Sequence, residues 1–167
     1  AMQEALDRTA PTSQGTPGAP EQIQGFYASA KVSNSANISI TNDTLTALTF
    51  NTEDWDTGGL HSPSTNPGRL TAPVAGKYLI GLKIGFDTNA TGYRQVSIRL
   101  NGATVIGLLR QMAVTTAGIP TFMGITLPYN LAVNDYVEAL VQHVAGGALD
   151  VRAGADSSPI FSMTLFM

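Results

Sequence analysis

The chain has 167 residues, of which 43% are hydrophobic, and its formal net charge is −3. This length suits one domain with a sizeable core, and the acidic balance gives no basic field that would gather phosphates, so nucleic acid is a poor candidate partner. The sequence contains no cysteine, which excludes a disulfide framework, a thiolate nucleophile and a cysteine zinc site.

Charged residues are scarce. Lys, Arg, Asp and Glu together make up 13% of the chain, against a usual share of about 25%. Because exposed surface is normally rich in charge, we expect part of this surface to be buried against other chains. The composition therefore favours an oligomer.

The first residues differ from the rest of the chain. The stretch "AMQEALDRTA" is long enough for two turns of helix, and "PTSQGTPGAP" concentrates the Pro, Gly, Ser and Thr that are typical of linkers. Residues 15–20 form two Gly-X-Pro triplets, which have the collagen period but are too few for a triple helix. We predict that residues 1–22 are a flexible linker or the end of a stalk, and that residues 23–167 are the folded domain.

From Ile23 onward almost every segment has the pattern of a β-strand. Alternating or β-branched runs are separated by clusters of Asn, Asp, Gly and Pro, and no helix of ordinary length is visible. Between residues 76 and 86, apolar side chains fall on one face and should pack against an opposing sheet about 10 Å away; they are Tyr78, Ile80, Leu82, Ile84 and Phe86. The pattern predicts an all-β antiparallel sandwich, jelly roll or barrel.

A tight turn is predicted in the middle of the chain. Val96, Ile98 and Leu100 share one face of a strand, and Asn101-Gly102 follows with a strong hairpin signal. Further on, residues 111–134 are uncharged, but prolines and several threonines interrupt them, so we expect no membrane insertion.

Two late segments are apolar on both faces. The run 136–144 has Tyr136 and Leu140 beside Glu138, and the end of the chain alternates large apolar groups on both sides. Either these strands are buried within one subunit, or their second face is covered by another subunit. On the second reading, the trimer-interface candidates are Tyr136, Leu140, Phe161, Met163 and Leu165.

Three acids close in sequence are the candidate ion site. Glu53, Asp54 and Asp56 supply the carboxylate oxygens that calcium prefers. Their spacing lacks the glycine and the terminal glutamate of an EF-hand loop, so a solvated loop is the alternative interpretation. Calcium is accordingly the one candidate cofactor.

Trp55 and Tyr93 are the candidate binding residues. Both flank loop signals, and exposed aromatic side chains often contact sugars or protein partners. The alternative for Trp55 is a structural role, in which its ring plugs one end of the sandwich.

Catalysis has few available groups. His61 and His143 are the two histidines, and the sequence lacks a Gly-x-Ser-x-Gly elbow, a His-Glu-x-x-His pair and a glycine-rich phosphate loop. We therefore predict that the protein is not an enzyme.

Five stretches together are similar to a known family: "FNTEDWDTGG", "NPGRLTAPVAGKYLIGLKIGF", "SIRLNG", "YNLAVNDYVEALV" and "IFSMTLFM". They resemble the globular head of complement C1q and its tumour-necrosis-factor relatives, in the bacterial and phage form, over about Phe26 to Met167. The most specific match is Ala72, Pro73, Gly76 and Tyr78. This sequence departs from the pattern where phenylalanine, tyrosine or glycine is commoner; the departing residues are Leu70, Ile80, Trp55, Asn134 and Met163.

The resemblance implies a ten-stranded antiparallel jelly-roll sandwich that forms a homotrimer, with the terminal strand near the threefold axis and a shaft before each head. It also implies that the apolar second faces are covered by neighbouring subunits, and that calcium is a known ligand of some relatives.

We therefore expect a non-enzymatic head domain of a phage or bacterial surface fibre, located on a virion or on a bacterial extracellular surface. Its partners would be two further copies and a host-surface glycan or protein receptor. A purely structural cap, decoration or trimerisation module is the first alternative. A carbohydrate-active enzyme on a similar sandwich, using His61 or one of the acids of residues 53–56, is the second.

Overall fold

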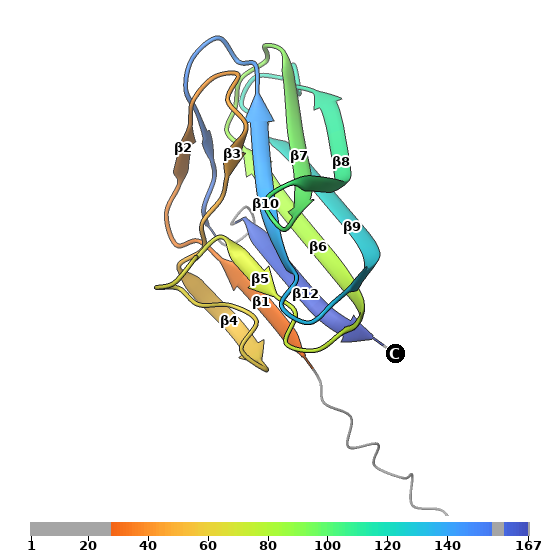
Figure 1. Ribbon diagram of the computed structural model, residues 1–167. Helices are drawn as coiled ribbons and strands as arrows, with labels where there is room; N and C mark the ends of the chain where they lie inside the picture. The colour runs from red at the N-terminus through yellow and green to blue at the C-terminus, as the bar shows by residue number, and fades with distance from the viewer. Residues whose placement is uncertain (1–27, 155–158, 167) are drawn as a thin grey trace, which may run out of the picture.

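The computed structural model describes residues 28–154 and 159–166, which form an all-β sandwich of two antiparallel sheets (Figure 1). Sheet A contains β1 (Ser29–Ser33), β2 (Ile38–Ile40), β4 (Thr52–Thr57), β6 (Gly76–Phe86), β9 (Thr121–Leu131), β11 (Leu149–Val151) and β12 (Ile160–Phe166). Sheet B contains β3 (Thr46–Ala47), β5 (Arg69–Thr71), β7 (Tyr93–Leu100), β8 (Thr104–Met112) and β10 (Tyr136–His143). The predicted fold class is confirmed. The linker prediction for residues 1–22 lies outside the described residues.

Strand β6 is the centre of sheet A. It pairs with β9 along one edge and with β12 and then β11 along the other, while β1 and β4 continue the sheet beyond β12. In sheet B the order runs from β3 and β5 through β10 and β7 to β8. Consecutive strands β8 and β9 thus lie on different sheets at the same side of the molecule (Figure 1). Within the described ranges, no helix is long and apolar enough to cross a membrane.

The described residues contain twelve strands, where ten were expected. Part of the difference arises at the edge of sheet B. There β5 pairs with Tyr136–Glu138 and β3 pairs with Leu140 and Val141, so two short pieces share the edge of one strand, β10. The intervening β4 belongs to sheet A, which is why the chain leaves this edge and returns to it.

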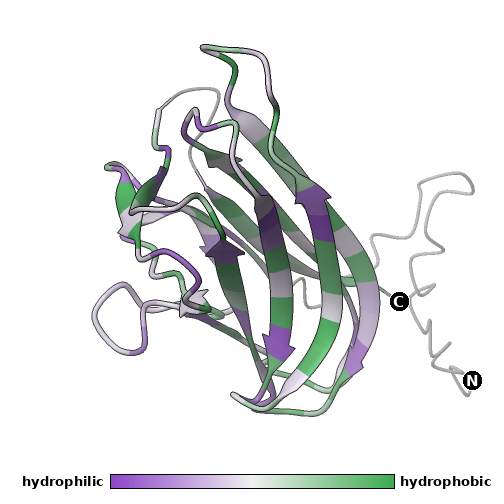
Figure 2. Cartoon of the chain, turned by 90° about the horizontal axis from the view of Figure 1, so that it is seen from above, coloured by the Kyte–Doolittle hydropathy of each residue, from purple (hydrophilic) through white to green (hydrophobic). Residues whose placement is uncertain are grey.

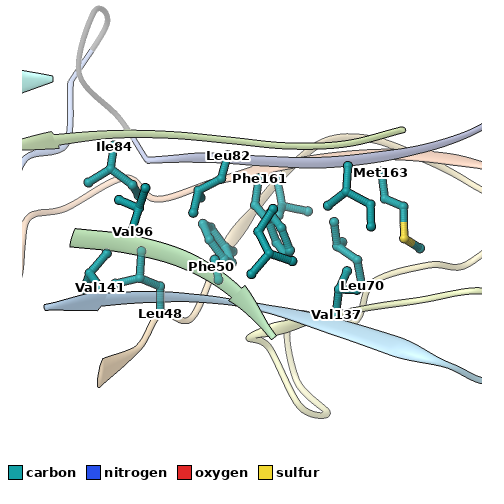
Figure 3. Close-up of a cluster of buried hydrophobic side chains, with 14 of the residues drawn as sticks. Leu48, Phe50, Leu70, Leu82, Ile84, Val96, Val137, Val141, Phe161 and Met163 are labelled. Carbon is teal, nitrogen blue, oxygen red and sulfur yellow. The ribbon is translucent and has the colours of Figure 1, made fainter. Parts of the chain in front are cut away.

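The core lies between the two sheets, as the alternation in residues 76–86 predicted. The five apolar side chains of β6 are at most 3% exposed and belong to the buried cluster, in which Ile84 of β6 points toward Val96 of β7 (Figure 3). Phe50 and Phe161 stack in the middle of this layer with their ring centroids 5.6 Å apart. Figure 2 shows the corresponding alternation, with hydrophobic bands separated by polar ones along the long strands.

The predicted turn after β7 is present. Asn101 and Gly102 both have positive φ, 50° and 70°, and a three-residue connection joins β7 to β8. The Asn101 side chain also fixes the start of β10, since its Oδ1 accepts a hydrogen bond from the Tyr136 backbone N–H and its Nδ2 donates to Asp135. A turn asparagine thereby connects two strands of sheet B.

Gly92 and Gly118 give a matched test of one close approach in the fold. Both have positive φ, 69° and 79°, but a Cβ added at Gly92 would overlap the Val144 carbonyl oxygen, whereas one at Gly118 would meet nothing within 4 Å. We predict that Gly118→Ala lowers the free energy of unfolding by about 1 kcal/mol, the cost of a left-handed alanine.

Gly92→Ala should cost a further 1 to 3 kcal/mol, roughly the penalty of overpacking, because two backbone segments must separate. Urea denaturation of both variants at one protein concentration checks this. Equal losses would show that the approach of residue 92 to Val144 is not tight.

Candidate interaction surfaces

An apolar strip lies along the edge where β8 and β9 meet. Val105, Leu108 and Met112 on β8 are large and exposed, Met112 to 72%, and Phe122 on β9 is exposed near the Met112 end of the strand. Gln111 donates through Nε2 to the Phe122 carbonyl oxygen at 3.2 Å, which ties the two strands together at this point. We call these four residues the edge patch.

The outer face of sheet A has exposed apolar groups at one end and two outward lysines on β6, Lys77 and Lys83. Leu79 and Pro128 lie directly opposite each other on β6 and β9, and Phe166 of β12 is a diagonal neighbour; Leu79 is 46% exposed. The face continues through small side chains, which are Gly81, Gly124, Thr126, Ser162 and Thr164. We call Leu79, Pro128 and Phe166 the face patch. Exposed apolar groups next to small side chains on this outer face suit contact with another protein surface.

The residues predicted at a trimer interface are placed differently. Phe161 and Met163 have no exposed surface, because the β12 register turns both into the core opposite Leu82 and Ile80. Leu140 is 1% exposed within the subunit.

The other two interface candidates are partly accessible. Leu165 is half-buried against the core, and Tyr136 is half-buried beneath the Arg69 guanidinium, whose centre is 3.9 Å from the ring. Large exposed apolar side chains on neighbouring strands are found instead in the edge and face patches. The signal for the edge patch was in the sequence "TVIGLLRQM", which is apolar on both faces as β10 and β12 are.

The three acids of β4 have separate partners. Glu53 Oε1 is 2.8 Å from His61 Nδ1, and Asp54 Oδ2 is 2.7 Å from Lys31 Nζ. Asp56 accepts hydrogen bonds from the backbone N–H groups of Leu60 and His61 at 2.9 and 3.0 Å. Among the described residues no group of three or more His, Cys, Asp or Glu side chains converges as metal ligands would. Glu53 and Asp56 thus fix the loop after β4, and Asp54 ties β4 to β1.

The two aromatic candidates lie on different sheets. Trp55 is 48% exposed on β4; its Nε1 donates to Ser29 Oγ at 3.1 Å, and Lys31 Nζ lies 5.2 Å from the ring centroid. Because Ser29 and Lys31 project from the outer side of β1, the interpretation of Trp55 as a plug at the end of the sandwich is wrong. Tyr93 begins β7, with the Arg110 guanidinium 4.2 Å from its ring. The two rings form no common site.

Both histidines are buried and bonded to the fold. His61 Nδ1 faces Glu53, and its Nε2 is 3.0 Å from the Pro67 carbonyl oxygen. His143 Nε2 is 3.0 Å from the Ile40 carbonyl oxygen. Neither ring bonds a hydroxyl group of the described residues, so the geometry there shows no nucleophile next to a base.

Four loops meet at the end of the sandwich opposite the entry of the chain into β1 (Figure 1). Hydrogen bonds connect them, among them Asp43 N to the His143 carbonyl oxygen and Asn89 Nδ2 to the Ala145 carbonyl oxygen. We call these segments the apical loops: residues 41–45, 87–92, 113–120 and 144–148. They are rich in Thr, Asn, Ala and Gly.

Arg94 holds one apical loop from below. Its guanidinium is fully buried and donates to three backbone carbonyl oxygens, those of Asn89, Thr91 and Tyr93, at 2.7 to 3.0 Å. Burial lowers the pKa of Arg94 from its ordinary value, because the charged form loses solvation. The charge is stabilised by main-chain oxygens.

No family model matches the sequence, and no curated protein matches it. Solved structures do match. Eiger TNF from S. frugiperda has a TM-score of 0.62 and 14% identity over 84% of this chain and 93% of its own, and the globular domain of zebrafish complement 1qA has 0.60 and 13% over 84% and 98%. The fold is that of the C1q/TNF jelly rolls. Murine APRIL, at 0.61 and 10% over 84% and 99%, has the same C1q/TNF-like sandwich.

Replacing Arg94 tests the support of the apical loops. We predict that Arg94→Met lowers the free energy of unfolding by about 2 to 4 kcal/mol, because three carbonyl groups lose their donors. Urea denaturation gives the value. The matched control is Arg152→Met, whose ion pair with Asp87 at 3.5 Å is at the surface and should be worth less than about 1 kcal/mol. Equal effects of the two substitutions would contradict a specific role for Arg94.

Proposed function

We propose that this chain is the homotrimeric head of a phage or bacterial surface fibre, and that it binds a host surface. The observation that carries the proposal is the pair of apolar patches, edge and face, on adjacent sides of one sandwich. Domains with the C1q/TNF fold typically form homotrimers and serve as binding modules, generally without enzymatic activity. Their usual location is extracellular.

The two patches fit a head-to-tail contact between copies. The edge patch lies on β8 and β9, and the face patch lies on the outer face of sheet A, so the edge patch of one subunit can meet the face patch of the next. When different patches meet, the interface is heterologous, and a rotation of one third of a turn closes it into a ring of three. Such a ring covers both patches of every subunit, which agrees with the low content of charged residues.

The position of the loops supports the adhesive role. Ala28 accepts a hydrogen bond from Leu165 N at 2.8 Å, so the chain enters beside the terminal strand and at the end opposite the apical loops (Figure 1). A fibre attached before residue 28 would present three identical sets of apical loops outward. Three linked sites increase avidity by as much as 10² to 10⁴ without any new contact.

The trimer is tested with charge substitutions in the edge patch. We expect the wild-type protein to be a trimer at micromolar concentration, and Leu108→Glu and Met112→Glu to be monomers with unchanged circular dichroism, since burying a carboxylate costs more than about 3 kcal/mol. Size-exclusion chromatography with light scattering measures the mass.

The matched control is Leu45→Glu, which places the same charge on an exposed leucine of an apical loop. It should remain a trimer. A monomeric wild-type protein, or a trimer that tolerates both edge-patch substitutions, would overturn the proposed assembly.

Adhesion is tested separately, by binding of the wild-type trimer and of a monomeric edge-patch variant to host cells. Saturable binding that is at least tenfold weaker for the monomer supports the adhesive role. A stable trimer that binds no host surface supports the structural alternative instead.

A further inference from the structure

A surface hollow of about 310 Å³ lies between the loop after β4 and strand β5. Its lining includes Ser62 and Thr65 from the loop, Arg69 and Thr71 from β5, and Tyr136 from β10. This space suits one sugar ring or a group of similar size. The hollow is distant from the edge and face patches in the strand order, so the proposed trimer does not need it.

Arg69 is held in a fixed position at the wall of this hollow. Its guanidinium stacks on the Tyr136 ring at 3.9 Å, and its Nε donates to Glu138 Oε1 at 3.3 Å. No hydrogen bond engages either terminal nitrogen of Arg69 within residues 28–154 and 159–166, and its side chain is 35% exposed. The two-nitrogen end of the guanidinium is therefore both free and preorganised.

The charges around Arg69 favour an anion. Glu138, its carboxylate partner, is shared with Arg99, whose Nη2 lies 2.9 Å from Oε2. Arg110, on the same outer face of sheet B, donates to the neutral Gln95 side chain. Two guanidinium groups, those of Arg69 and Arg99, thus share the Glu138 carboxylate, and Arg110 adds a third positive charge on this face, although the whole chain carries a net charge of −3.

The nearest acids of the loop are already engaged. Asp56 accepts the backbone N–H groups of Leu60 and His61, and Glu53 faces the His61 ring. These carboxylates bond the loop backbone and the His61 imidazole. The guanidinium of Arg69 is therefore the charged group that lines the hollow.

We propose that this hollow binds a carboxylate-bearing sugar of an acidic polysaccharide, with Arg69 as the recognising residue. The free end of its guanidinium matches the two oxygens of a carboxylate, and the hydroxyls of Ser62 and Thr65 suit the hydroxyls of the same ring. This inference rests on the proposed host-surface function and names its ligand class. Three hollows per trimer would bind one polymer with avidity.

The test measures binding of the full chain to immobilised polygalacturonate, dextran sulfate and neutral dextran by biolayer interferometry. We expect binding to polygalacturonate and not to dextran, and a 10- to 100-fold loss in Arg69→Gln, about the worth of hydrogen bonds to a charged group. Arg69→Lys keeps the charge and its neighbour Glu138 paired, and should lose affinity less than Arg69→Gln does.

Arg152→Gln is the matched control, because it removes one positive charge from a surface arginine after β11. It should bind within about twofold of the wild type. An equal loss of polygalacturonate binding in this control would show a general charge effect and overturn the inference. The same holds if the wild type binds dextran sulfate but not polygalacturonate, and Arg69→Gln binds dextran sulfate equally well. Thermal melting of each variant shows whether a loss of binding comes from unfolding. If Arg69→Gln is unfolded, the affinity of Arg69→Lys for polygalacturonate is compared with that of the wild type instead.

Host-cell binding separates the two proposals. If the wild type binds cells and Arg69→Gln binds them equally well, the head function stands and the carboxylate site is wrong. If the wild type binds polygalacturonate through Arg69 but no host surface, the site stands and the adhesive function is wrong.

Discussion

The apolar contact between the two sheets determines the arrangement of everything else in this molecule. The inner faces of β6 and β12 are buried against β7 and β10, with Phe50 and Phe161 stacked between them. Because side chains alternate along a strand, fixing the inner face also fixes which residues point outward. Met163 and Phe161 are committed to the core by the same register that directs Phe166 to the surface.

The same constraint explains how much the sequence could reveal. The alternation in residues 76–86 identified the core face of β6, and Asn101-Gly102 identified the turn between β7 and β8, because both signals are local. Strand β12 shows the limit of prediction from sequence. Apolar residues on both of its faces indicate that both faces are covered, but they do not identify what covers each face. Only the register with β6 shows that Phe161 is covered by sheet B, and that the uncovered side belongs to Phe166.

The candidate sites depended more strongly on tertiary pairing. Glu53, Asp54 and Asp56 are close in sequence, yet Asp54 pairs with Lys31 of β1 while Glu53 and Asp56 both bond the loop after β4 at His61, and no spacing rule predicts these partners. Conversely, Arg69 and Arg99 are thirty residues apart by number and meet at Glu138 because β5 and β7 flank β10. The sequence alone does not predict this cross-strand row of Arg69, Glu138 and Arg99, which contains the residues of greatest chemical interest on sheet B.

Arg94 anchors one apical loop through the loop backbone, which affects how the sequence of that loop can change. Its three hydrogen bonds end on main-chain oxygens, which every amino acid supplies. The Thr91 side chain can therefore be exchanged without removing the anchor beneath it, whereas the Asn89 side chain also bonds the neighbouring loop at Ala145. The sequence at the tip of this loop could therefore diverge while its backbone path is kept.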